Sequence, residues 1–192
     1  MKRPAYYLVN AITGYRLMAF FILIFLLFQS DLLLFKWLLG ISFFTDLIDG
    51  YLARKLKVQS TFGARLDSVA DDLTVLAGIV GMYLFKRTFF DEQLMLLVVM
   101  LGLFLVQTVI ALFRYGKTTS FHTYLAKIAA ILQGTFLILL FFLEQPPYLL
   151  FYLAAFITTL ELLEEIIITF MLPEWKTDVK GVFHVMRSLK SK

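Results

Sequence analysis

The segment DLIDGYLARKLKVQSTFGARLDSVAD, residues 46–71, places four aspartates at the adjoining ends of two apolar stretches. Asp46 and Asp49 are three residues apart, and Asp67 and Asp71 are four apart, so each pair lies on one face of a helix. The polar residues between the pairs are expected to form a loop that makes the two helices antiparallel neighbours. The pattern therefore predicts that the two aspartate pairs face each other.

A cluster of four carboxylates at the end of two apolar helices needs a counter-charge. An ionised carboxylate inside a membrane span costs about 2.5–3.5 kcal/mol, and like charges also repel one another. Oxygen ligands suit Mg²⁺ or Mn²⁺, and the chain has no cysteine that could supply thiolate ligands. The cluster predicts a divalent metal site. The alternative is that the aspartates are merely solvated at the helix ends.

The composition makes a membrane the natural surroundings of this chain. Of its 192 residues, 60% are hydrophobic and only 17% are charged, against about 25% charged residues in average soluble domains. So few polar residues cannot coat a soluble domain of this size. Despite the net charge of +4, the composition also excludes a disordered chain or a nucleic-acid-coating protein, and membrane lipids are the expected partners.

Six apolar stretches predict an all-α integral membrane protein with six spans, the first of which is short unless the preceding turns at Ala11–Tyr15 extend it. We expect a single membrane domain over residues 1–192, with an N-terminal interfacial helix over residues 1–15, spans within 16–172 and a basic cytoplasmic tail at 173–192. The expected spans are Arg16–Phe28, Leu32–Leu52, Leu66–Phe85, Leu94–Phe113, Tyr124–Leu143 and Tyr148–Leu172.

Basic residues give the expected orientation. With the N-terminus inside, all lysines and arginines except Lys36, Lys86 and Arg87 fall on the cytoplasmic side, as the positive-inside rule requires. Both termini are therefore expected in the cytoplasm, together with the aspartate cluster. This distribution suits a bacterial inner membrane.

Small and basic residues between the aspartates extend the predicted site. Gly50 and Ala53 lack bulk on the face of the first pair, so a ligand can approach the backbone closely, and Gly63 opens the matching face of the second pair. Arg54 is a fixed cation suited to a diphosphate oxygen, and Ser60 offers a hydroxyl. The alternative for the small residues is an ordinary helix–helix contact.

The full pattern Asp46-x2-Asp49-Gly50-x2-Ala53-Arg54-x8-Gly63-x3-Asp67-x3-Asp71 resembles the signature of the CDP-alcohol phosphotransferase family of membrane enzymes. The resemblance implies a six-helix protein, usually a homodimer, with a polar cavity open to the cytoplasm. It also implies transfer of a phosphatidyl or other substituted phosphoryl group from a CDP-linked donor, such as CDP-diacylglycerol, to an alcohol, with release of CMP.

The same resemblance assigns roles by position. It implies that Asp46, Asp49, Asp67 and Asp71 hold a pair of Mg²⁺ or Mn²⁺ ions and that Asp71 is also the general base. It implies that the CDP moiety is received by a set of small and polar residues, namely Gly50, Ala53, Arg54, Ser60 and Gly63. Upstream, Asn10-x2-Thr13-x2-Arg16 resembles the N-terminal pattern of phosphatidylglycerophosphate synthases in this family, which would add Asn10 and Thr13 to the CDP site; routine polar contacts of an interfacial helix are the alternative.

The acceptor alcohol is expected to be glycerol 3-phosphate. Arg65, Arg114, Lys117 and Lys127 would form a pocket for its phosphate, or alternatively only attract anionic lipid and fix the topology. Ser68 follows the third aspartate where phosphatidylglycerophosphate synthases more often have proline, which leaves inositol, inositol phosphate or serine as alternative acceptors.

A second class of function is an ion-coupled transporter, because carboxylates inside membranes also mark ion pathways. Such a protein predicts acidic residues spread across the membrane and repeated segments, whereas these aspartates cluster at one end and no repeat is visible. Elsewhere, Glu161, Glu164 and Glu165 share a helical face. We expect a structural ion pair between them and Lys127 or Arg114; the alternative is that they shape the acceptor cavity. Trp175 is expected to anchor the basic tail at the membrane surface.

Overall fold

The structure is a computed structural model that describes residues 2–56, 61–177 and 179–190. Within these ranges it describes all side chains except those of residues 2–13, 46, 47, 49–56, 61–65, 67, 68, 189 and 190.

The described chain is all-helical, as the sequence predicts, and contains seven α-helices and one isolated β-bridge between Ser120 and Thr177. The helices are α1 (Lys2–Phe28), α2 (Leu32–Leu56), α3 (Thr61–Phe85), α4 (Arg87–Tyr115), α5 (Tyr124–Phe142), α6 (Tyr148–Met171) and α7 (Val182–Lys190).

Helix boundaries differ from the expected spans mainly at polar ends. The expected interfacial helix and the first span form one continuous helix, α1. Residues Lys86–Gln93, expected to be a loop, are helical from Arg87 onward because charge does not interrupt a helix by itself. Arg87 Nε donates to Asp91 Oδ2 over 2.9 Å, an i,i+4 pair that supports the first turn of α4.

The surface of the helices fits a lipid environment. Helices α4 and α5 are each long and apolar enough to cross a membrane, and shorter apolar helical stretches run over Gly14–Phe28 and Leu32–Thr45. Large apolar side chains face outward on several helices, among them Phe28 at 84% and Phe113 at 89% exposure. Exposed large apolar side chains on several helices are compatible with a membrane protein.

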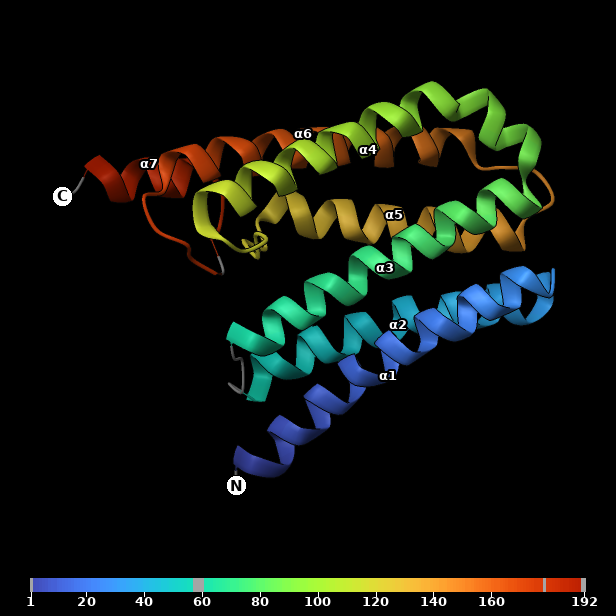
Figure 1. Cartoon of the computed structure of the whole chain (residues 1–192), viewed down its shortest axis with the longest axis horizontal. Coiled ribbons are helices and arrows are strands. Elements are labelled where there is room, and N and C mark those ends of the chain that lie inside the picture. The colour runs from blue at the N-terminus through green and yellow to red at the C-terminus, as the bar shows by residue number, and fades with distance from the viewer. Residues whose placement is uncertain (1, 57–60, 178, 191–192) are drawn as a thin grey trace. The chain divides into compact units, whose positions relative to one another are not determined.

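The chain packs into two compact units, Met1–Asp91 with Leu137–Pro146, and Glu92–Phe136 with Pro147–Lys192. In the first unit α1, α2 and α3 contact one another and lie side by side (Figure 1). The core of this unit includes Phe35, which is fully buried and whose ring lies edge-on to that of Phe141 at a centroid distance of 5.2 Å.

Gly81 on α3 lets this aromatic core close. A Cβ atom at Gly81 would lie 2.5 Å from Phe35 Cζ, and the Phe35 ring is held by Phe85 and Phe141. We therefore expect Gly81→Ala to destabilise the protein by about 1–3 kcal/mol through overpacking, measured by thermal unfolding in detergent. Gly40→Ala on α2 is the control, because no atom lies within 4 Å of its added Cβ; equal unfolding temperatures for the two variants would refute the packing argument.

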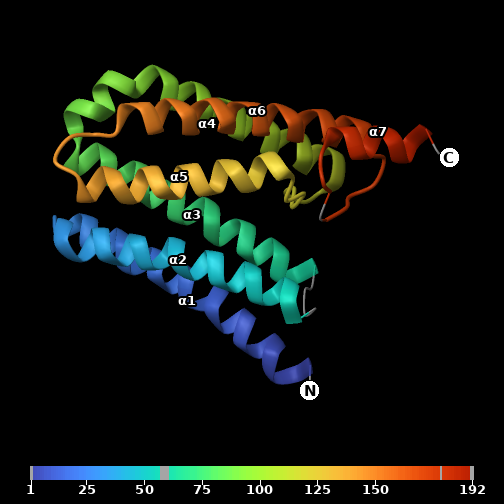
Figure 2. The same cartoon turned by 180° about the vertical axis from the view of Figure 1, so that it is seen from behind.

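In the second unit the tail folds back onto the helices. The segment after α6 loops away and returns, so that α7 lies against α6 (Figure 2). Val179 and Val185 of the tail are buried in a cluster with Phe121, Ile168 and Leu172. Trp175, expected at the membrane surface, donates its indole N–H to Thr118 O over 3.0 Å. The tail is therefore part of a packed core that also holds the loop between α4 and α5.

Candidate functional site

The four signature aspartates lie on the backbones of α2 and α3, two helices that contact each other. On α2, Phe35, Leu39 and Ser42 are fully buried, and the same helical repeat continues through positions 46 and 49. On α3, Ala70, Thr74 and Ala77 are buried, and positions 67 and 71 fall in register with them. Along the helical backbone, positions 46 and 49 on α2 and 67 and 71 on α3 are thus in register with these buried residues.

Most side chains of the predicted sites lie outside the description. Ser60 is outside the described backbone. Of Gly50 and Gly63 the structure describes the backbone alone, and the same holds for Asn10, Thr13, Asp46, Asp49, Ala53, Arg54, Arg65 and Asp67. Among the side chains that are described, no group of three or more histidines, aspartates or glutamates is placed to hold a metal ion.

Asp71 is the one signature aspartate whose side chain the structure describes, and it forms an ion pair with Arg16. The Arg16 guanidinium on α1 donates a hydrogen bond to Asp71 Oδ1 on α3. The Arg16 side chain is only 1% exposed, whereas that of Asp71 is 39% exposed. The contact joins the N-terminal helix to the last aspartate of the signature and leaves the carboxylate partly accessible.

Arg16 lies on the buried face of α1. Ala19 and Leu23, three and seven residues further on, are also fully buried, so Arg16 extends an otherwise apolar stripe toward α3. An arginine is tolerated there because a carboxylate compensates its charge. The sequence pattern singled out Arg16 but did not place it in the site; its spacing from Asn10 and Thr13 was the only signal.

The neighbouring Asp72 lies on a different face from Asp71. Its side chain is exposed, as expected for a residue one position, or about 100°, further around the helix. Asp72 therefore provides a chemically matched comparison for Asp71 in experiments.

A carboxylate set of this kind fits a pair of hard divalent ions. Oxygen-only ligands at i,i+3 and i,i+4 spacing on two contacting helices match the chemistry of Mg²⁺ and Mn²⁺. Arg16 places a positive charge at Asp71, the one of these four carboxylates whose side chain the structure describes. The residue types of the signature are those that bind Mg²⁺ or Mn²⁺.

The predicted acceptor residues of the second unit have structural contacts of their own. Arg114, in the last turn of α4, donates to Phe170 O and Leu172 O at the C-terminal end of α6, both over 3.2 Å. Lys117 Nζ lies 5.1 Å from the Trp175 ring centroid, and Lys127 Nζ lies 5.5 Å from that of Tyr124. Both ammonium groups are within cation–π range, and both lysines are exposed.

The prediction of an ion pair between the α6 glutamates and Lys127 or Arg114 is wrong for the described residues. Glu165 Oε2 instead accepts hydrogen bonds from Gln107 Nε2 over 2.6 Å and Thr119 Oγ1 over 2.7 Å. Glu165 and Gln107 are both buried, so neutral donors satisfy a carboxylate that sequence reasoning assigned to a cation. The sequence feature that could have indicated this contact is Gln107, a polar residue within the apolar α4.

Comparison with known proteins finds a family model that matches most of the chain and relatives that match shorter stretches of it. The profile of the CDP-alcohol phosphatidyltransferase family matches residues 6–171. The CDP-diacylglycerol--glycerol-3-phosphate 3-phosphatidyltransferase of Haemophilus influenzae is 40% identical over 74 residues, which cover 38% of this chain and 40% of the relative.

Two further relatives match shorter stretches. The enzyme of the same name from Wigglesworthia glossinidia brevipalpis is 42% identical over 62 residues, or 32% of this chain and 34% of its own. A chloroplastic/mitochondrial form from Arabidopsis thaliana is 58% identical over 36 residues, or 19% of this chain and 12% of its own. The aligned stretches thus span well under half of each relative. No solved structure gives a significant match.

Proposed function

Because this chain belongs to the CDP-alcohol phosphatidyltransferase family, we propose that it transfers a phosphatidyl group from CDP-diacylglycerol to glycerol 3-phosphate and releases CMP. The observation that carries the proposal is the complete aspartate signature on α2 and α3, with Asp71 paired to Arg16. The names of the relatives favour glycerol 3-phosphate as the acceptor.

We propose that Asp46, Asp49, Asp67 and Asp71 hold two Mg²⁺ or Mn²⁺ ions. When bound, such ions neutralise diphosphate oxygens and make CMP a better leaving group. The register of the two helices supports this role, since it aligns both pairs with the faces that α2 and α3 bury.

The reaction needs one proton transfer from the acceptor. Asp71 takes the proton of the acceptor hydroxyl, whose oxygen forms a bond to the β-phosphorus of the donor while the bond from that phosphorus to the CMP oxygen breaks. Arg16 orients the Asp71 carboxylate through the ion pair between them. Gly50, Ala53 and Gly63 leave room for the CDP moiety, and Arg54 pairs with its diphosphate. Asn10, Thr13 and Ser60 supply further hydrogen bonds to that moiety.

Four basic residues are proposed to bind the phosphate of the acceptor: Arg65, Arg114, Lys117 and Lys127. The contacts of Lys117, Lys127 and Arg114, whose side chains the structure describes, support this role to different degrees. The exposed ammonium groups of Lys117 and Lys127 contact only aromatic rings in the described contacts, so they can turn toward an anion. Arg114 is already engaged by α6 carbonyls, so an acceptor would have to share its guanidinium.

The lengths of the helices bear on the membrane topology of the enzyme. Helices α1 to α6 each have at least 19 residues, which is about the length that crosses a bilayer. We propose six spans with both termini and the aspartates on the cytoplasmic side of a bacterial inner membrane, and a homodimer as the functional unit.

A panel of acceptors tests the assignment. The purified chain is incubated with CDP-diacylglycerol and Mn²⁺, and CMP release is measured with glycerol 3-phosphate, serine, inositol or inositol phosphate in separate reactions. We expect glycerol 3-phosphate to support release at least about a hundredfold faster than the others, since a phosphate paired with fixed cations is hard to replace. Preference for another acceptor would overturn the glycerol 3-phosphate assignment but leave the phosphatidyl transfer intact.

A further inference from the structure

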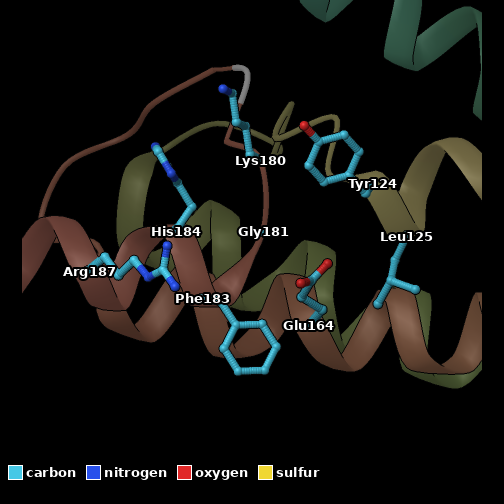
Figure 3. A pocket seen from close by; sticks show the side chains of 8 residues that line it. All are labelled: Tyr124, Leu125, Glu164, Lys180, Gly181, Phe183, His184 and Arg187. Carbon is cyan, nitrogen blue, oxygen red and sulfur yellow. The ribbon is translucent and has the colours of Figure 1, made fainter.

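A pocket of about 530 Å³ lies in the second unit, where the tail returns to the start of α5 and the last turns of α6. Its volume is in the range of small-ligand sites. Figure 3 shows the side chains that line it, which come from three separate parts of the unit: Tyr124, Leu125, Glu164, Lys180, Phe183, His184 and Arg187, with Gly181 between them. None of these residues has a place in the proposed transfer reaction.

Glu164 is the acidic group of the pocket, and one of its oxygens is already used. Glu164 Oε1 accepts the backbone N–H of Val182 over 3.1 Å, which satisfies a donor at the beginning of α7. Gly181 permits this contact, because its φ of +148° and the 3.1 Å between an added Cβ and Glu164 Oε1 both disfavour any other residue. A structural role thus accounts for Oε1.

The second oxygen has no such explanation. Glu164 Oε2 is buried and has no hydrogen-bond partner among the described residues. A buried carboxylate oxygen without a donor is costly and uncommon in folded proteins. Glu164, which lines the pocket, thus carries an oxygen whose missing hydrogen bond a ligand with a hydroxyl or ammonium group could supply.

Basic groups dominate the remaining wall. Lys180 and Arg187 are exposed, and no described carboxylate lies within ion-pair distance of either. The formal charges of Lys180, Arg187 and Glu164 in the pocket sum to one positive charge. A ligand with a single negative charge and a hydrogen-bond donor complements this arrangement in both respects, whereas a zwitterionic ligand has no net charge to match.

We propose that this pocket binds the head group of an anionic glycerophospholipid, with the phosphodiester at Lys180, Arg187 and His184 and a head-group hydroxyl donating to Glu164 Oε2. Aromatic side chains at the pocket favour a lipid over a soluble phosphate. Phe183 is 80% exposed and Tyr124 is 63% exposed, as expected for rings that rest against acyl chains and the interface. The proposal concerns binding alone and does not depend on the transfer reaction.

Binding of two lipids of equal charge can distinguish specific recognition at this site from the general attraction of a basic tail to anionic membranes. Native mass spectrometry of the full chain in detergent measures binding of short-chain phosphatidylglycerol and of phosphatidylmethanol, which has the same charge but no head-group hydroxyl. Wild-type protein should prefer phosphatidylglycerol about tenfold, the value of one hydrogen bond to a charged acceptor. Equal binding of the two lipids would overturn the proposal.

Variants test the individual contacts. Lys180→Ala and Arg187→Ala should each weaken phosphatidylglycerol binding about tenfold, whereas Lys176→Ala, the same charge change on the same tail outside the pocket, should leave it unchanged. Glu164→Gln keeps an acceptor for Val182 and should abolish the preference between the two lipids. Equal losses in Lys176→Ala and Lys180→Ala, or stronger binding of phosphatidylglycerol by Glu164→Gln, would show attraction by charge alone and refute the site.

A third ligand distinguishes a lipid from a soluble ligand. Glycerophosphoglycerol carries the same phosphodiester and hydroxyl groups without acyl chains. We expect it to bind at least about a hundredfold more weakly than the lipid, because it cannot bury apolar surface against Phe183 and Tyr124. Binding as tight as that of the lipid would contradict a lipid site.

Discussion

Replacing Asp71 by Asn is expected to reduce CMP release by at least about 10³-fold in the presence of Mn²⁺ and saturating substrates. General-base catalysis alone contributes about 10²–10⁴-fold, and the amide also removes an anionic ligand of the proposed metal pair. Asparagine keeps the size of the side chain and an oxygen that can accept the hydrogen bond from Arg16. The loss should therefore appear in turnover rather than in folding.

Asp72→Asn is the matched control, since it makes the same chemical change one residue further along α3 on an exposed side chain. It should retain activity within about threefold, as exposed substitutions outside special features usually do little. Both variants are compared by CMP release and by thermal unfolding in detergent. Turnover by Asp71→Asn close to that of the wild type would remove Asp71 as the base, and equal losses in both variants would show that the site is not confined to the signature face.

The second large effect is expected at Arg16. Removing one partner of a fully buried ion pair costs about 3–5 kcal/mol because a charge is left uncompensated. The Asp71 side chain is 39% exposed, so water screens part of this penalty, and we expect Arg16→Ala to destabilise the protein by about 1–3 kcal/mol. Activity should fall about 10- to 100-fold, because the Asp71 carboxylate loses the group that orients it.

Three comparisons isolate the ion pair. Arg87→Ala breaks the exposed Arg87–Asp91 pair and should change stability by less than about 0.5 kcal/mol. Arg16→Lys should keep the charge but lose the planar hydrogen-bonding geometry, giving an intermediate activity. The double variant Arg16→Ala with Asp71→Asn should be less destabilised than the sum of the single changes. Full additivity would contradict a direct role of this contact.

The sequence predicts the helical elements well because their signal is local. Apolar stretches bounded by polar turns place the ends of α2, α5 and α6 within a few residues of those observed. The i,i+3 and i,i+4 spacing of the aspartates needs only helical geometry, and the structure keeps positions 67 and 71 in register with the buried Ala70 and Thr74.

Contacts between distant residues are what the sequence could not supply. The pairing of Arg16 with Asp71 spans 55 residues, and Glu165 is satisfied by Gln107 and Thr119 rather than by a cation. Charge patterning pairs opposite charges by default, whereas a folded core can satisfy a carboxylate with neutral donors. The return of the tail is equally non-local, since Val179 and Val185 become apolar core only when Phe121 lies against them.

The most direct test of phosphatidyl transfer at a metal-dependent aspartate site is a balance of products. The purified chain is given CDP-diacylglycerol labelled in its phosphatidyl group, glycerol 3-phosphate and Mn²⁺. We expect CMP and labelled phosphatidylglycerophosphate in equal amounts, with both lost on addition of a chelator and restored by excess Mn²⁺. Release of CMP with labelled phosphatidic acid in place of the new lipid, or transfer that continues unchanged after chelation, would contradict this account.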